Sequence, residues 1–161
     1  MNQTEQIAKH LRDVHFGGNW TSVNLRQTLA GVDWQQATAK LPSFNTIAGL
    51  VYHVHYYVEA ILNVLKGGPL DAHDRYSFDL PPIQSSDAWM QLVEKTWQDA
   101  EELARLVEQL PETKLAETFV EEKYGTYYRN LHGLIEHTHY HLGQMVLIKK
   151  LLRENEAASK S

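Results

Sequence analysis

The stretch that decides the fold is NLHGLIEHTHYHLGQMVLIKKLL, residues 130–152. Its leucine, isoleucine and methionine residues recur at the three- and four-residue spacing of one helix face, which predicts a long helix. Residues four apart lie one above the other on a helix, so His137 and His141 share a stripe at the edge of the apolar face. His132 and His139 share a different stripe, turned away from it. The His137–His141 pair is therefore the one placed to face a neighbouring helix.

Three further helices are expected from the same apolar spacing. They cover residues 4–14, 46–65 and 85–110. Gly17 and Gly18 are expected to interrupt the chain after the first helix, because a glycine costs about 1 kcal/mol relative to alanine inside a helix. Residues 67–69 (Gly-Gly-Pro) are typical of a helix end. The irregular stretch that follows, residues 70–84, is a candidate lid or crossover connection.

Four long helices predict an all-α protein, a four-helix bundle whose winding order the pattern leaves open. We expect one domain over residues 1–155, followed by a polar tail at residues 156–161. The segment between the third and fourth long helices, residues 113–128, is the least helical part of the chain. Its composition allows a short hairpin there.

The composition narrows the functional classes. The 161 residues carry a net charge of −5, which argues against nucleic acid or an anionic membrane as the partner. The chain contains no cysteine, so a metal site would have nitrogen and oxygen ligands only. The first residues lack the apolar core of a signal peptide, and no apolar run is long enough to span a membrane. A cytoplasmic location is expected.

Histidines at the edges of two apolar stripes predict a metal site. His53 lies at the edge of the stripe of helix 46–65, near Tyr57, whereas His55 is expected to point away, toward solvent or a partner chain. Together with His137 and His141, His53 would form a three-imidazole set that leaves coordination positions open. The alternative is a polar layer of hydrogen-bonded histidines and tyrosines. The histidines assigned to surface or loop positions without a role are His10, His15, His73 and His132.

Several segments resemble the DinB/YfiT-like superfamily. TIAGLVYHVHYYVEAIL, residues 46–62, is similar to the family helix in which an apolar stretch leads into a single histidine ligand. HTHYHLGQMVLIKKLL, residues 137–152, resembles the closing signature, in which histidine, three residues and a second histidine precede x-Gly-Gln. GGNWTSVNLRQTL (residues 17–29) and SSDAWMQLV (residues 85–93) also fit, so the likeness spans nearly the whole chain.

The resemblance implies a four-helix bundle of DinB type, often a homodimer. It also implies a divalent metal such as nickel or zinc, held by His53, His137 and His141. Relatives of known activity include S-transferases and isomerases that use low-molecular-weight thiols, and others are assigned as metal-dependent hydrolases. A metal-dependent transferase or hydrolase acting on a small molecule is therefore expected, and any thiol must come from a cosubstrate because the chain lacks cysteine. Tyr57 and Gln144, each one turn beyond a ligand, are candidate pocket residues.

Other functions predict different behaviour. A non-catalytic dimeric bundle with a structural or ligand-binding role predicts no reaction rate that depends on His53. Metal storage or sensing is less favoured, since the chain shows no basic DNA-binding face. A di-iron carboxylate centre needs two Glu-x-x-His motifs, and Glu136-x-x-His139 occurs once and on the outward face. The tryptophans assigned to the core or a dimer interface are Trp20, Trp34, Trp89 and Trp97.

Overall fold

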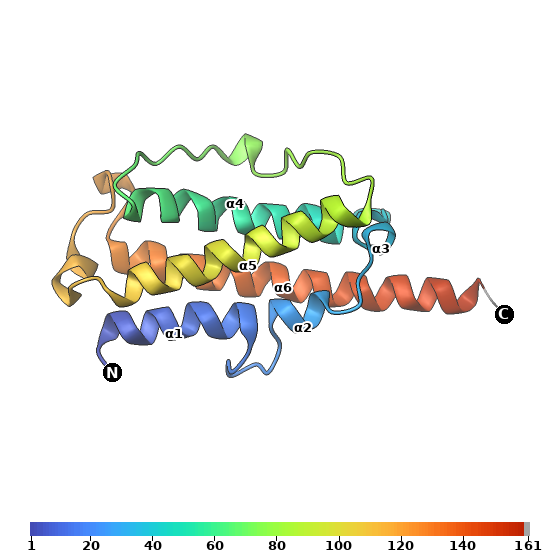
Figure 1. The fold of residues 1–161 in the computed structure, drawn as a ribbon, viewed down its shortest axis with the longest axis horizontal. Coiled ribbons are helices and arrows are strands. Elements are labelled where there is room, and N and C mark those ends of the chain that lie inside the picture. The colour runs from blue at the N-terminus through green and yellow to red at the C-terminus, as the bar shows by residue number, and fades with distance from the viewer. Residues whose placement is uncertain (160–161) are drawn as a thin grey trace.

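The computed structural model describes residues 1–159, and its four long helices form a bundle (Figure 1). They are α1 (Gln3–Phe16), α4 (Ile47–Leu65), α5 (Ser86–Glu108) and α6 (Tyr127–Ala158). Two short helices in the connection between α1 and α4 are α2 (Leu25–Leu29) and α3 (Trp34–Thr38). The predicted all-α four-helix bundle is confirmed. No helix among the described residues is long and apolar enough to cross a membrane.

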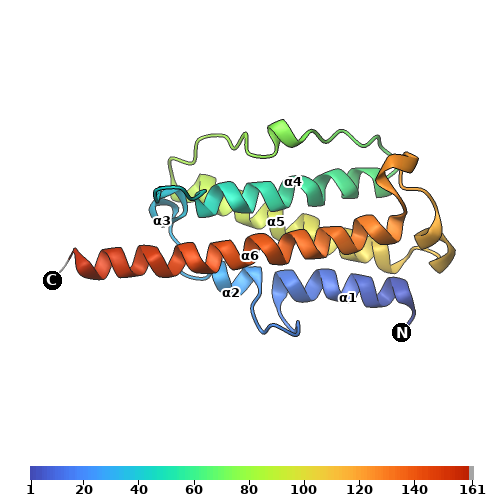
Figure 2. The same cartoon turned by 180° about the vertical axis from the view of Figure 1, so that it is seen from behind.

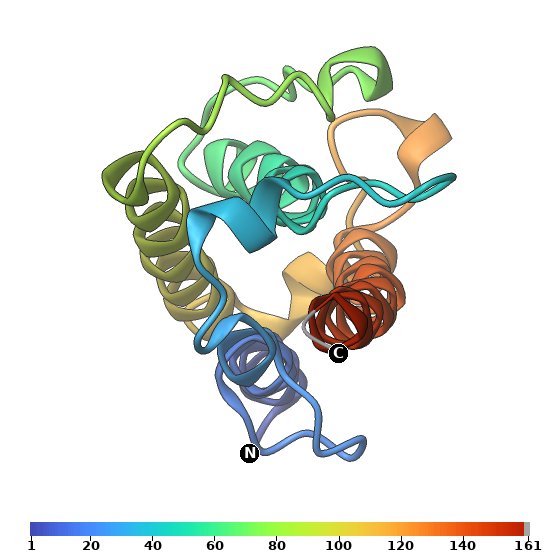
Figure 3. The same ribbon diagram turned by 90° about the vertical axis from the view of Figure 1, so that its right-hand side faces the viewer.

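The winding order is up-down-down-up. α1 and α6 run in one direction, and α4 and α5 run in the other (Figure 2). Each long helix packs against two neighbours: α1 and α4 both contact α5 and α6, which gives a four-cornered bundle when it is viewed end-on (Figure 3). Because α4 and α5 are parallel, residues 66–85 return along the length of the bundle on the outer side of α4 (Figure 1). The long irregular stretch is therefore a crossover connection.

Side-chain hydrogen bonds cap the N-terminal ends of α4 and α5. The Thr46 hydroxyl accepts a hydrogen bond from the Gly49 amide at 3.0 Å, and the Ser85 hydroxyl accepts one from the Ala88 amide at 3.1 Å. Each cap satisfies a backbone amide that has no partner inside its own helix. At the C-terminal end of α1, Gly17 adopts φ +120°, and the helix ends there as the sequence predicts.

The last helix is longer than its apolar pattern indicates. Its N-cap is Thr126, whose hydroxyl accepts a hydrogen bond from the Arg129 amide at 3.2 Å, so the helix begins before residue 130. It then continues to Ala158, and residues 156–158 of the expected polar tail are helical. Residues 160–161 lie outside the described part of the chain.

The hairpin that the sequence allows between α5 and α6 is reduced to one antiparallel bridge, Thr118 to Thr126, with no strand among residues 1–159. Two 3-10 helices, Glu112–Ala116 and Glu122–Tyr124, lie on either side of residue Thr118 instead. Val120 adopts a left-handed conformation, φ 58°, just after the bridge. The chain changes direction at Val120, so the residues that follow it cannot continue a two-stranded ladder.

The apolar core divides into two clusters along the bundle axis. On α6 the first cluster ends at Ile135 and the second begins at Leu142. The stretch between them holds His137 and His141, and it lies opposite His53 on α4. A layer of polar side chains therefore separates the two apolar clusters.

The tryptophans differ in burial. Trp89 is buried, and its indole Nε1 donates to the Val32 carbonyl at 2.9 Å. Trp34 and Trp97 are partly buried against the same apolar cluster. Trp20 is 100% exposed at the turn after α1, so a core position is wrong for this residue.

His15 is fully buried, which corrects its assignment to the surface. The helix does not end at Val14 but continues to Phe16, which places His15 one turn after Leu11 on the core-facing stripe. Its Nδ1 donates to the Leu11 carbonyl at 2.7 Å, whereas Nε2 has no hydrogen-bond partner among the described residues. Burial lowers the His15 pKa from 6.5 to about 4, because an imidazolium would lose its solvation there.

This buried imidazole should make the fold acid-sensitive. Below pH 6.5 an unfolded chain takes up a proton at His15 that the folded chain does not take up until the pH nears 4. As the pH is lowered from 6.5 to 5, His15 alone should therefore reduce the free energy of unfolding by about 2 kcal/mol. Urea denaturation of the His15→Leu variant should show a shallower pH dependence than the wild type. The exposed His10→Leu control should show the same dependence of unfolding free energy on pH as the wild type. The same dependence in His15→Leu would contradict the conclusion that the buried His15 makes the fold acid-sensitive.

Candidate metal centre

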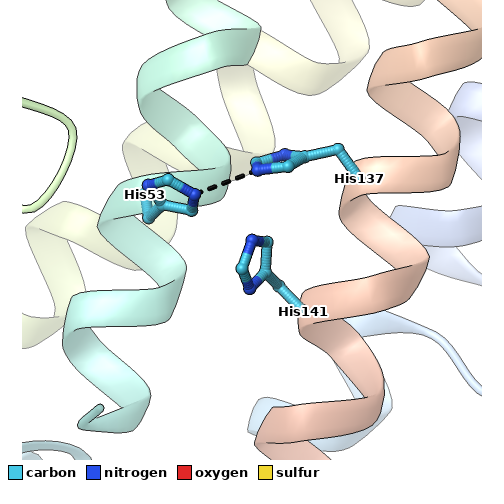
Figure 4. Close-up of side chains that lie close together, drawn as sticks. All are labelled: His53, His137 and His141. Carbon is cyan, nitrogen blue, oxygen red and sulfur yellow. Dashed lines mark hydrogen bonds between the residues drawn. The ribbon is translucent and has the colours of Figure 1, made fainter. Parts of the chain in front are cut away.

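Three histidines converge in the space between α4 and α6. His53 reaches in from α4, and His137 and His141 reach in from α6 (Figure 4). One ring nitrogen of each lies within 4.8 Å of the other two. His53 Nε2 and His137 Nε2 are 3.0 Å apart, and the His141 ring centroid lies 4.6 and 4.5 Å from those two rings. The structure thus brings together the three side chains that the sequence singles out, and they could hold a metal ion.

Burial favours the neutral, ligand-competent form of all three imidazoles. It lowers the pKa of His137 to about 4, with the nearby His141 and His53 acting in the same direction. Burial also lowers the pKa of His53, as does the proximity of His141, whereas the Ser77 backbone opposes this shift. The pKa of His141 is likewise lowered by burial, against the effect of its hydrogen bond to Gln144. At neutral pH each ring therefore has a free lone pair for a cation.

The hydrogen bonds around the cluster fit a cation better than a closed polar layer. His141 Nδ1 donates to Gln144 Oε1 at 2.7 Å, which leaves Nε2 of that ring unprotonated. The Nδ1 atoms of His53 and His137 are buried without a hydrogen-bond partner among the described residues. A neutral imidazole carries one proton, so the His53–His137 contact alone must leave one ring with a bare Nδ1 and the other with an unused N–H. A cation bound at both Nε2 atoms would replace this contact, and each ring would then carry its proton on Nδ1.

The crossover connection covers the outer side of His53. Phe78 stacks on the His53 ring with a centroid distance of 4.0 Å and an interplanar angle of 10°. Tyr57 donates its hydroxyl proton to Asp74 Oδ1 at 2.7 Å, which holds the connection to α4. The Ser77 hydroxyl donates to the Asp74 carbonyl at 2.7 Å and is itself buried. The connection therefore packs on the site instead of standing free in solvent.

The two candidate pocket residues have different positions. Tyr57 contacts His53 and His137 edge-on, at 5.2 and 5.0 Å between ring centroids, and it lines a cavity beside His137. Burial, with the hydrogen bond to Asp74, raises the pKa of Tyr57 to about 12, so it remains a neutral phenol. Gln144 supports the His141 ring and is not among the residues that line this cavity.

His55 is not turned toward solvent or a partner chain, which corrects the expectation from the sequence. It is 5% exposed and packs against α5, where its Nε2 lies 2.7 Å from Asp99 Oδ2. Lys95 pairs with the same carboxylate and lies 3.6 Å from Glu59. His55, Glu59 and Asp99 also have the spacing of a metal site. The Lys95 ammonium already supplies a cation to both carboxylates, so we interpret this group as an ion-pair network.

His139, on the same helix as His137 and His141, lies apart from the centre. His139 Nδ1 donates to the Ile135 carbonyl at 3.1 Å, and Asn19 donates to His139 Nε2 at 3.2 Å. These contacts hold the turn after α1. Sequence reasoning missed Phe78 and Asp74 as neighbours of the centre, and the one relevant signal was that residues 70–84 formed a candidate lid.

A protein-family model described as the DinB superfamily matches residues 19–145. The matched region includes all three converging histidines and runs from the turn after α1 into α6. No curated protein and no solved structure matches the chain.

The ion-pair network between α4 and α5 should support the fold without contributing to metal binding. Asp99→Asn removes the carboxylate that His55 and Lys95 share and should lower the free energy of unfolding by about 3 kcal/mol. Urea denaturation measures the loss, and Glu94→Gln, an exposed change on the same helix, is the matched control. Both variants should retain the wild-type metal content. A loss of metal in Asp99→Asn would contradict the assignment of this group as structural.

Proposed function

The chain belongs to the DinB superfamily, and on that premise we propose that it is a metal-dependent enzyme acting on a small molecule. His53, His137 and His141 would hold one divalent ion. The observation that carries the proposal is the convergence of three neutral imidazoles from two rigid helices, with the Nε2 atoms of His53 and His137 3.0 Å apart. An all-nitrogen set of this kind suits nickel or zinc, and three protein ligands leave coordination positions open for water or substrate.

The chemistry would be transfer to or from a low-molecular-weight thiol, or hydrolysis. A divalent ion in this site supplies a positive charge that lowers the pKa of a bound water or thiol toward neutrality. The chain's own groups position the reactants. Gln144 holds His141 in one tautomer, while Phe78 and Tyr57 shield the centre from solvent on the side of the crossover connection. With no cysteine in the chain, a thiol nucleophile would come from a cosubstrate.

Removing two ligands should abolish metal binding. The tag-free protein should contain about one nickel or zinc ion per chain by elemental analysis, as three imidazoles on rigid helices imply. The His53→Ala/His141→Ala double variant should contain none. His10→Ala, at an exposed position on α1, is the control and should match the wild type. No metal in the wild type after addition of nickel, zinc and manganese would overturn the metal-dependent function and favour a non-catalytic dimeric bundle.

Gln144 should influence metal affinity through the His141 ring. Gln144→Leu removes the acceptor of the Nδ1 proton, and loss of such a contact typically weakens metal binding by about 10- to 100-fold. Competition with a chelator measures the dissociation constant. Gln144→Glu keeps an acceptor and should retain high affinity, and Gln98→Leu on α5 serves as the surface control. Equal affinity in Gln144→Leu and the wild type would rule out this supporting role.

A further inference from the structure

A cavity of about 290 Å³ leads from the histidine centre toward the start of α6. Its lining includes Tyr57 and Ile61 from α4, and Arg129, Gly133, Leu134 and His137 from α6. One end of the cavity therefore meets a proposed metal ligand, and the other end meets Arg129. The two apolar side chains, Ile61 and Leu134, lie in its walls.

The cavity follows one stripe of α6. Arg129, Gly133, His137 and His141 are four residues apart, so they lie in a row along the same side of the helix. At about 1.5 Å per residue, the Cα atoms of Arg129 and His137 are about 12 Å apart along the axis. Between them Gly133 has no side chain, and a Cβ atom added there would have no neighbour within 4 Å. The floor of the cavity is therefore bare backbone.

The Arg129 side chain has no anionic partner. Among residues 1–159 no carboxylate lies within ion-pairing distance of it, and it sits in the first turn of α6, where the helix dipole disfavours a cation. Gly125 leaves room for its stem, because an added Cβ atom there would lie 2.9 Å from Arg129 Cδ. The neighbouring Asn130 amide already donates to the Tyr124 and Thr126 carbonyls. Arg129 is thus the charged donor left free at this end.

We propose that this cavity binds a small elongated substrate by an anionic group, a carboxylate or a phosphate, which pairs with Arg129. The reacting group of that substrate would lie at the histidine centre, and a short apolar stem would pack between Ile61 and Leu134 over Gly133. Guanidinium geometry matches both anions through paired N–H donors. Asp74 contacts the Tyr57 hydroxyl, so an anion is favoured at the Arg129 end and not beside Tyr57. This inference rests on the proposed function, since the histidine centre supplies the reacting end.

Three thiols of equal length test the proposal, with a carboxylate, a phosphate or an uncharged carboxamide at the end opposite the thiol. Calorimetric titration into the zinc-loaded protein should show at least one charged thiol binding about tenfold tighter than the carboxamide. The charged thiol that binds more tightly shows whether the cavity prefers a carboxylate or a phosphate. Arg129→Gln should abolish the preference and Arg129→Lys should keep part of it, whereas the exposed Arg105→Gln control on α5 should leave it unchanged. Gly133→Leu should weaken all three thiols by filling the cavity.

Metal content measured on the same samples separates the two claims. Full zinc content with no preference for charge in the wild type, or with a preference that survives Arg129→Gln, would overturn the cavity assignment while the metal centre stands. If zinc does not bind, the proposed function fails, and the same titrations are made on the metal-free chain. There a charge preference that Arg129→Gln removes would support the cavity, and its absence would overturn the assignment.

Discussion

The antiparallel packing of α4 against α6 is the contact on which the rest of the structure depends. It sets His53 opposite His137 and His141 at the level where one apolar cluster gives way to the other. A buried nitrogen without a hydrogen-bond partner costs about 1–3 kcal/mol, and two of these rings have one. The two apolar clusters above and below must offset that cost. A cation bound to the folded chain alone would add stability by mass action, so the proposed function and the stability of the bundle are physically linked.

The winding order explains how the centre is enclosed. Since α4 and α5 are parallel, the chain must cross the full length of the bundle between them, and it does so over the outer side of α4. This crossing brings Phe78 onto the His53 ring and Asp74 to the Tyr57 hydroxyl. An up-down-up-down bundle with short loops would have no such connection. The centre stays open to the cavity that runs past Tyr57 toward Arg129.

The sequence predicts positions that depend on residue spacing within one helix, and it fails for contacts that depend on how the helices pack. The stripe that carries His137 and His141, and the edge position of His53, depend on spacing within one helix, so the pattern alone indicates them. His55 was predicted wrongly because α4 packs on two neighbours, and the side turned away from α6 faces α5. His15 was predicted wrongly because its helix continues two residues beyond Val14, the last residue of its apolar pattern. Contacts across the crossover depend on the winding order, which no local pattern encodes.

The central claim is that one metal ion is held by three imidazoles from α4 and α6. X-ray absorption at the nickel or zinc edge of the loaded protein tests it most directly, because imidazole rings give a characteristic outer-shell scattering that reports their number. We expect three imidazoles on the metal, with the remaining positions filled by water or another light ligand. A spectrum that shows one imidazole together with carboxylate oxygens would contradict it. Such a spectrum would instead place the metal at His55, Glu59 and Asp99.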